Sequence, residues 1–562
     1  MKKNIPSSSS RAFARYTAQL LVAVLAPLAS AQAQIAPEFG ADGGPEGDAD
    51  TTLEMMESED FGLPAVLRED EPATDPSLFE EAGDILPERY LIRSVPWSAP
   101  DYSKQEGSLG WAKDTFNVPP ELAIRVRFWK DVYAKYTTDQ GVLHDIEDLS
   151  VVYEDLDFTP IMREKKTLAA KARARTSLVN AKRKEIRSRL ERLSNMRSAR
   201  DVKGETDRRY LAYFTKDGAM TDQAIARLFE KSNAKELQAL RSRLKAASTK
   251  RRVRFQLGQK DKFILGIYYS GRYLREMEKV FRSEKMPVEL TRLPFVESSF
   301  NIQARSRVGA SGVWQFMPRT AKPWMLVSSD VDERNDPMTA TVSAARLLKA
   351  NYDRLQTWPL ALTAYNHGAA GVARAVRVTG SRDLPVIIEK YRNRRFGFAS
   401  SNFYACFLAA LEVEKEARAL LGDVKWSLEF DGVEVDLTKR DFKRTVNWNL
   451  LVSFYDGDSV LAELQNPHLT SRLKKSGREL PKKTFIRVPS SRAEIVSSYL
   501  SGKTSIEELK RVLALTPIPR SDLSNESKSE KLGEVSESMK AILPFVAPVG
   551  ASDGKANSPA AD

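Results

Sequence analysis

Pro287–Phe300 reads PVELTRLPFVESSF, and its apolar residues stand at helical spacing. Leu290, Leu293 and Glu297 stand at positions i, i+3 and i+7, so the acid lies on the apolar face of a predicted helix that Pro287 opens. A carboxylate on an apolar face is costly unless it is paired or protonated. Glu297 is therefore either a buried acid satisfied by arginine or backbone donors, or a general acid whose pKa is raised by desolvation.

Two motifs downstream favour the catalytic interpretation. Ala304–Pro318 reads ARSRVGASGVWQFMP, where Gly309 and Gly312 permit close approach of the backbone. Ala364–Gly368 reads AYNHG, at the end of a predicted helix that the glycine terminates. An aromatic ring and a methionine can flank the faces of a sugar, while glutamine and asparagine amides can hydrogen-bond its acetamido groups. An acid, amides and apolar walls together predict a saccharide cleft.

These motifs, in this order, resemble those of the lytic murein transglycosylase family, which shares a lineage with goose-type lysozyme. LPFVESSF followed by GVWQFMP is most similar to the membrane-bound lytic transglycosylase D subgroup, and the resemblance covers about residues 255–420. It implies a mainly helical, lysozyme-like catalytic domain that needs no cofactor or metal. It also implies non-hydrolytic cleavage of the bond between N-acetylmuramic acid and N-acetylglucosamine in peptidoglycan glycan strands, which leaves 1,6-anhydro ends.

The resemblance makes Glu297 the single catalytic acid and base. The residues that it assigns to positioning the acid or binding substrate are Ser298, Gln315, Met317, Tyr365 and Asn366, with Tyr404 as a weaker candidate. Phe300 and Trp314 are interpreted as core residues.

The chain departs from the family pattern at two positions. His367 stands where the family usually has a small residue, and we interpret it as filling space. The order Asn402-Phe403-Tyr404 puts a phenylalanine in the place of a family tyrosine, which is why Tyr404 is the weaker candidate.

Two alternatives remain open: a goose-type lysozyme that admits water, and an inactive peptidoglycan-binding protein that has kept the cleft. The motifs contain no second acid for a two-carboxylate mechanism. The nearest acids in the sequence are Asp330, Asp332, Glu333 and Asp336. They fall in a predicted loop, where Asp336 is expected to cap the helix that Pro337 opens.

The N-terminus has the pattern of a secretory signal peptide. Basic residues precede the apolar stretch Leu20–Leu28, and two A-x-A sites follow, so residues 1–33 are predicted to be removed on export. No cysteine stands near the cleavage site, so no lipid anchor is expected. The mature protein is predicted to work in the periplasm or cell envelope, beginning with a disordered acidic linker over residues 34–88.

Residues 89–254 are predicted to form a helical domain that contains a basic hairpin. Ile161–Arg200 holds 14 Lys or Arg and three Glu, a net charge of +11 (14 minus 3), against +12 for the whole chain. A solvated outer face is the favoured interpretation, and adhesion to an anionic wall or membrane surface is the alternative. Nucleic acid is not an expected partner, because no aromatic or glycine pattern of a nucleic-acid module accompanies the charge.

The catalytic domain is predicted over residues 255–425, followed by a small α+β module over 426–490 and then a helix and disordered tail over 491–562. The module is weakly similar to a LysM repeat, and alternating apolar residues around Asp431-Gly432 predict a β-hairpin in it. Cys406 is the single cysteine, so no intramolecular disulfide can form. The three histidines are scattered along the sequence and predict no zinc site.

Overall fold

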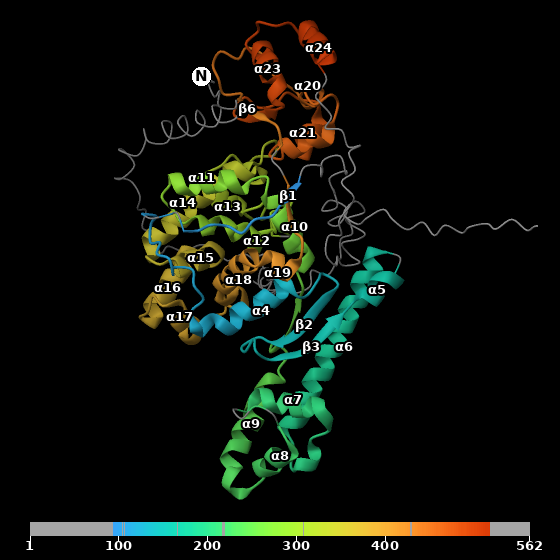
Figure 1. The fold of residues 1–562 in the computed structure, drawn as a ribbon, viewed down its shortest axis with the longest axis vertical. Coiled ribbons are helices and arrows are strands. Elements are labelled where there is room, and N and C mark those ends of the chain that lie inside the picture. The colour runs from blue at the N-terminus through green and yellow to red at the C-terminus, as the bar shows by residue number, and fades with distance from the viewer. Residues whose placement is uncertain are drawn as a thin grey trace, which may run out of the picture. The chain divides into compact units, whose positions relative to one another are not determined.

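The computed structural model describes residues 94–516, apart from residues 104, 106, 166, 216, 217, 219, 307, 428 and 429 (Figure 1). The predicted signal peptide, acidic linker and C-terminal tail lie outside these residues. The described chain is mainly helical with three small sheets, which confirms the predicted fold class.

Its contacts define two units, which are described separately. The larger contains residues 94–430 and 446–481, and the smaller contains residues 431–445 and 482–516.

A three-stranded antiparallel sheet divides the larger unit into two hydrophobic cores. β2 (Gln140–Asp145) is the middle strand, with β3 (Val152–Asp157) on one side and β4 (Val253–Leu257) on the other. Successive side chains of a strand point to opposite faces. Val142 accordingly packs into one core and Leu143 into the other.

Helices between β3 and β4 form one of these cores. They are α5 (Thr159–Glu164), α6 (Leu168–Ser194), α7 (Gly204–Phe214), α8 (Asp222–Leu228) and α9 (Ala234–Ala247). The contacts of α6 with α9 run antiparallel, as Glu191–Lys245 and Arg187–Ser248 show. α6 and α9 therefore form an antiparallel pair of helices, with α7 and α8 in the connection between them (Figure 1).

Helices that follow β4, together with α4 (Ala123–Ala134), form the other core. They are α10 (Lys260–Ser270), α11 (Leu274–Ser283), α12 (Leu293–Glu297), α13 (Pro318–Ala321), α14 (Pro337–Leu355), α15 (Trp358–His367), α16 (Ala369–Thr379), α17 (Leu384–Lys390), α18 (Phe398–Lys415) and α19 (Ala417–Leu421). α18 is the central helix, because it is buried along nearly all its length and contacts α4, α12 and α15.

Two further elements complete the larger unit. β1 (Ser94–Pro96) pairs with β5 (Lys425–Ser427). The short helices α20 (Trp448–Ser453), α21 (Ser459–Gln465) and α22 (Ser471–Ser476) belong to it as well. They are joined to the loop before α14, since Asp332 N–H donates to His468 O over 2.8 Å and Arg478 pairs with Asp330.

The smaller unit contains a two-stranded sheet and two helices. β6 (Val433–Asp436) pairs with β7 (Phe485–Val488), and the helices are α23 (Ala493–Leu500) and α24 (Ile506–Leu515). The predicted hairpin around Asp431-Gly432 is wrong, because the partner of β6 comes from about fifty residues later in the chain. The alternation of Val433 and Val435 identifies a strand with one buried face, but it does not identify the strand's partner.

Over residues 94–516, as far as they are described, no helix combines the length and the apolar character that crossing a membrane requires.

Candidate active site

Glu297 is the last residue of the short helix α12. The helix predicted to open at Pro287 is present in two parts: Val288–Arg292 form a 3-10 helix, and α12 follows it directly from Leu293. Pro294 accounts for the break, since it lacks the N–H that would continue the ladder and it suits the first turn of a new helix. The expected apolar surroundings are present, and only 5% of Glu297 is exposed.

The chain turns sharply after Glu297. Ser299 and Phe300 have φ angles of 52° and 57°, a left-handed conformation that residues with a side chain seldom adopt. The turn places the Phe300 ring in the core, edge-on to Phe295 with 4.8 Å between ring centroids. Ser298 Oγ donates a 2.8 Å hydrogen bond to Val313 O. The catalytic candidate is thereby connected to the glycine-containing loop that follows it.

The side chain of Gln315 connects two backbone positions of that loop. Its Nε2 donates to Ala304 O over 2.9 Å and to Gly312 O over 2.8 Å. Gly312 has a φ of 77°, and a Cβ there would lie 1.9 Å from the backbone oxygen of Arg334. The amide nitrogen of Gln315 is therefore engaged by the protein, while the predicted role of this residue toward the acid or substrate stays a prediction.

A buried arginine fixes the outer edge of the same loop. Arg334 Nη1 donates to Gly309 O over 2.6 Å and to Phe316 O over 2.9 Å. Its Nε and Nη2 bind the two carboxylate oxygens of Asp332 at 2.8 and 2.7 Å. Such a bidentate pair is geometrically specific, so it holds both ends of the loop in a single arrangement.

Tyr365, near the end of α15, is linked to the loop and to Glu297. Its hydroxyl donates a 2.8 Å hydrogen bond to Trp314 O. Burial raises the pKa of Tyr365 well above its usual value, and the charge of Glu297 raises this pKa further. The structure thus brings these two predicted site residues together, with the tyrosine hydroxyl protonated.

Asn366 and His367 meet Ser400 of α18. Ser400 Oγ donates to Asn366 Oδ1 over 3.5 Å and lies 2.9 Å from His367 Nδ1. The His367 ring packs edge-on against Phe396, with 5.1 Å between centroids. Burial lowers the pKa of His367, and Arg395 lowers it further. His367 thus contacts Phe396 and the serine beside Asn366, and its interpretation as filling space stays a prediction.

Met317 and Trp314 differ in exposure although they are close in sequence. Trp314 is fully buried, and its Nε1 donates to Thr341 Oγ1 over 2.9 Å. Met317 is 36% exposed, which is unusual for so large an apolar side chain. It is therefore accessible to a bound ligand, whereas Trp314 is a core residue as expected.

The sequence of this region matches a known domain. Residues 276–387, which include Glu297, the loop and α15, match the transglycosylase SLT domain. The chain carries a transglycosylase SLT domain. The resemblance to lytic murein transglycosylases is thus confirmed for this region.

Three relatives share parts of the chain. Membrane-bound lytic murein transglycosylase D of Escherichia coli K12 is 32% identical over 103 residues, which are 18% of this chain and 23% of the relative. A putative tributyltin chloride resistance protein of an Alteromonas species is 32% identical over 22% of this chain and 57% of its own length. Membrane-bound lytic murein transglycosylase F 2 of Alkalilimnicola ehrlichii is 31% identical over 23% of this chain and 32% of its own length. The matched parts are therefore less than two thirds of each relative.

Tyr404 lies beyond the residues that match the SLT domain. It is only 2% exposed, and its ring is stacked with that of Phe407. Burial raises its pKa far above the usual tyrosine value. Phe403 is fully buried as well, so α18 directs both rings into the core.

Sequence reasoning missed two residues near Glu297. The charge of Glu297 raises the pKa of Tyr133 on α4 and of Cys406 on α18, in both cases after the larger effect of burial. The Tyr133 ring lies 5.1 Å from that of Phe263, which in turn stacks on Phe295, two residues before the acid. No motif in the sequence indicates that Tyr133 lies close to Glu297.

Within the described ranges of the chain, no three His, Cys, Asp or Glu side chains come together as a candidate metal site.

Proposed function

We propose that this protein is a lytic transglycosylase that cleaves the β-1,4 bond between N-acetylmuramic acid and N-acetylglucosamine in peptidoglycan. The observation that carries the proposal is the buried Glu297, tied through Ser298 and lying close to Tyr365 within an SLT domain. Two of the three relatives are named lytic murein transglycosylases. Function is argued from the site and not from the fold alone.

One carboxyl suffices for the proposed reaction. Protonated Glu297 gives its proton to the glycosidic oxygen as the bond to C1 of muramic acid breaks. The neighbouring acetamido group stabilises the positive charge on the sugar. The Glu297 carboxylate then takes the proton of the 6-hydroxyl of the same muramic acid. As this proton leaves, the hydroxyl oxygen O6 bonds to C1. The acid is regenerated, the product is a 1,6-anhydro sugar, and no water is consumed.

The roles of the substrate-binding candidates belong to this proposal. Ser298 and Gln315 would hold the turn and loop that orient Glu297, through their bonds to Val313, Ala304 and Gly312. Met317 would contact a sugar face, and Tyr365 and Asn366 would line the cleft around the scissile bond. Tyr404 would act indirectly, by packing beneath the cleft, because its buried side chain does not reach a bound ligand.

The contacts of the four acids nearest to Glu297 in the sequence favour a single-carboxyl mechanism over a two-carboxylate hydrolase. Each of the four has a structural partner. Asp330 pairs with Arg478, Asp332 pairs with Arg334, Glu333 accepts from Leu326 N–H, and Asp336 accepts from Thr339 N–H. These contacts give each of the four acids a structural role in the loop before α14.

Mass spectrometry of digested peptidoglycan tests the proposal. The expected products are muropeptides that end in 1,6-anhydro-N-acetylmuramic acid. Reducing ends that are one water heavier would make the enzyme a goose-type lysozyme. The absence of any soluble product from several bacterial walls would favour the inactive binding protein.

We also infer that the protein is exported and works at the cell envelope, from the signal-peptide pattern of residues 1–33. Amino-terminal sequencing of secreted protein is expected to give a start within residues 32–35. An intact Met1 in an envelope fraction would contradict the inference.

Contact of the basic segment Ile161–Arg200 with an anionic wall or membrane surface is the alternative to a solvated face. Such binding should weaken as salt rises, because the Debye length is about 8 Å at physiological ionic strength. Reversing four basic residues of α6 should reduce pelleting with cell walls and leave cleavage of soluble oligosaccharides unchanged. Unchanged pelleting would favour a solvated face.

A further inference from the structure

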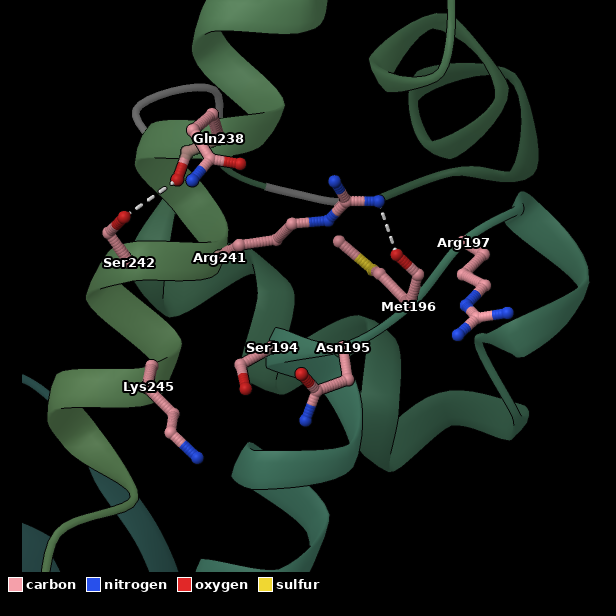
Figure 2. A pocket seen from close by; sticks show the side chains of 8 residues that line it. All are labelled: Ser194, Asn195, Met196, Arg197, Gln238, Arg241, Ser242 and Lys245. Carbon is pink, nitrogen blue, oxygen red and sulfur yellow. Dashed lines mark hydrogen bonds between the residues drawn. The ribbon is translucent and has the colours of Figure 1, made fainter.

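A groove between α6 and α9 has the features of an anion-binding site. Its volume is about 580 Å³, within the range of small-molecule sites. The residues that line it are Ser194, Asn195, Met196, Arg197, Gln238, Arg241, Ser242 and Lys245 (Figure 2). Three of these are cationic, four are neutral and polar, and none is acidic. A lining of this kind suits a hydrophilic anion rather than an apolar ligand.

The carbonyl end of α6, which would repel an anion, already has donors. Ser194 Oγ and Asn195 Nδ2 donate to Glu191 O over 2.7 and 2.9 Å. Arg241 extends from α9, and its Nη2 donates to Met196 O over 2.5 Å (Figure 2). These bonds offset the partial negative charge of the helix terminus.

The same contacts leave cationic donors available. Arg241 uses its Nη2 in the bond to Met196 O, and its positive charge remains in the lining of the groove. Arg197 is exposed, and its positive charge helps to lower the pKa of the nearby Asp201. Lys245 carries the third charge, in an exposed pair with Glu191 at 2.6 Å. An exposed pair of this kind is weak and readily exchanges its partner.

The two carboxylates beside the groove, Glu191 and Asp201, already have hydrogen-bond partners. Glu191 is held by Lys245, which lowers its pKa. Asp201 accepts the backbone N–H groups of Arg197 and Ser198, which lower its pKa. Neither carboxylate belongs to the lining.

From this arrangement we propose that the groove between α6 and α9 binds the phosphate group of a phosphate ester. Arginine forks match phosphate oxygens in pairs, and a lysine adds a point charge. The groove exceeds the size of one phosphate, so the ligand carries an organic part that meets Asn195, Gln238 and Ser242. The site shares no residue with the SLT domain, and the proposal does not depend on glycan cleavage.

The ester can be a soluble metabolite or a lipid headgroup, and two probes separate these sources. Calorimetry with inorganic phosphate and glycerol 3-phosphate measures soluble ligands. Flotation with phosphatidylcholine vesicles, with or without phosphatidylglycerol, measures a headgroup. The full-length mature protein is used at one fixed salt concentration, because charge screening changes both readouts.

Arg197→Gln combined with Lys245→Gln removes two of the groove's charges and leaves the Arg241–Met196 bond intact. The matched control is Arg472→Gln combined with Lys475→Gln, which removes two exposed charges from α22, outside both the groove and the basic helix α6. The groove variant is expected to bind at least about tenfold more weakly than wild type, while the control binds as wild type does. Binding of the soluble ester or of the anionic vesicles in this pattern supports the site and identifies its source. The proposal would be overturned if neither the soluble ester nor the anionic vesicles bound. It would also be overturned if both double variants weakened binding equally.

Discussion

The hydroxyl of Tyr365 donates a 2.8 Å hydrogen bond to the backbone oxygen of Trp314, the residue before Gln315. This bond joins the end of α15 to the loop that Arg334 and Gln315 hold from its two sides. Tyr365 also lies close enough to Glu297 for the carboxylate charge to raise its pKa. The bond therefore connects α15 to the loop at a residue whose pKa the charge of Glu297 also raises.

Tyr365→Phe removes the hydroxyl and keeps the ring, which packs edge-on to Phe316. A typical hydrogen bond stabilises by about 1 kcal/mol, so the free energy of unfolding should fall by roughly that amount. The rate of muropeptide release per folded molecule should also fall, because the loop beside Glu297 changes position. Urea unfolding and turnover are measured on the same preparation. Equal turnover in variant and wild type would separate this bond from catalysis.

Glu297→Gln keeps the shape of the side chain and removes its ability to donate or accept the proton. Turnover should fall by at least about 10²–10⁴-fold, the usual contribution of a general acid, because one carboxyl serves both steps. Folding and glycan binding should survive. Release of soluble muropeptides and pelleting with peptidoglycan are the two measurements.

Glu289→Gln is the matched control for that variant. Glu289 is another buried acid of the SLT domain, and its Oε1 accepts from Gln105 Nε2 over 2.8 Å and from Trp111 Nε1 over 3.0 Å. This variant is expected to lose stability, because a charge-assisted acceptor becomes a neutral one, but to keep its turnover per folded molecule. A collapse of turnover in both variants would indicate a general disturbance of the domain.

Helix ends were predictable where one residue imposes the geometry. Asp336 caps α14 as expected, with its carboxylate accepting Thr339 N–H at 2.9 Å. Gly368, with a φ of 88°, ends α15 as its position in AYNHG predicted. These rules act within one helical turn, so the local sequence contains all the information they need.

Features that depend on distant segments were not predictable from local sequence. β6 pairs with β7, and the alternation of its residues gave no information about that partner. Tyr133 approaches Glu297 only because α4 packs on α18, where Arg125 and Trp129 both donate to Asn402 Oδ1. The motifs identified the candidate acid, whereas its surroundings arise from tertiary packing.

Gly312→Ala tests how closely the backbone approaches within the loop. Its φ of 77° is unfavourable for alanine, and the new Cβ would lie 1.9 Å from Arg334 O, a backbone atom that cannot move alone. We expect the free energy of unfolding to fall by about 3 kcal/mol or more. Chemical denaturation measures this loss.

Gly309→Ala in the same loop is the comparison. Its φ is 93°, but the nearest atom to a new Cβ is Pro318 Cδ at 3.9 Å, an ordinary contact. Only the conformational cost of about 1–2 kcal/mol is expected. Equal losses from the two variants would mean that the contact with Arg334 does not restrict the loop.

His144 should make the stability of the protein depend on pH below neutrality. Burial lowers its pKa to about 3 from 6.5, and the nearby Arg254 and Arg183 act in the same direction. Its Nδ1 lies 2.9 Å from Asp145 O, and its buried Nε2 has no hydrogen-bond partner within the described structure. A second proton would therefore place an uncompensated charge between the rings of Phe128 and Phe398.

The sign follows from proton binding in the two states. Below pH 6.5 His144 binds a proton in the unfolded chain but stays neutral in the folded chain. The free energy of unfolding therefore falls as pH falls, until the folded pKa is reached. The loss from this group is about 2 kcal/mol at pH 5, at 1.36 kcal/mol per pKa unit. His144→Gln removes the titration while its amide can still donate toward Asp145 O. Unfolding free energies of both proteins between pH 5 and 7.5 should therefore converge as pH falls, because only the wild type carries the histidine contribution. Parallel pH profiles for the two proteins would show that His144 titrates alike in the folded and unfolded states.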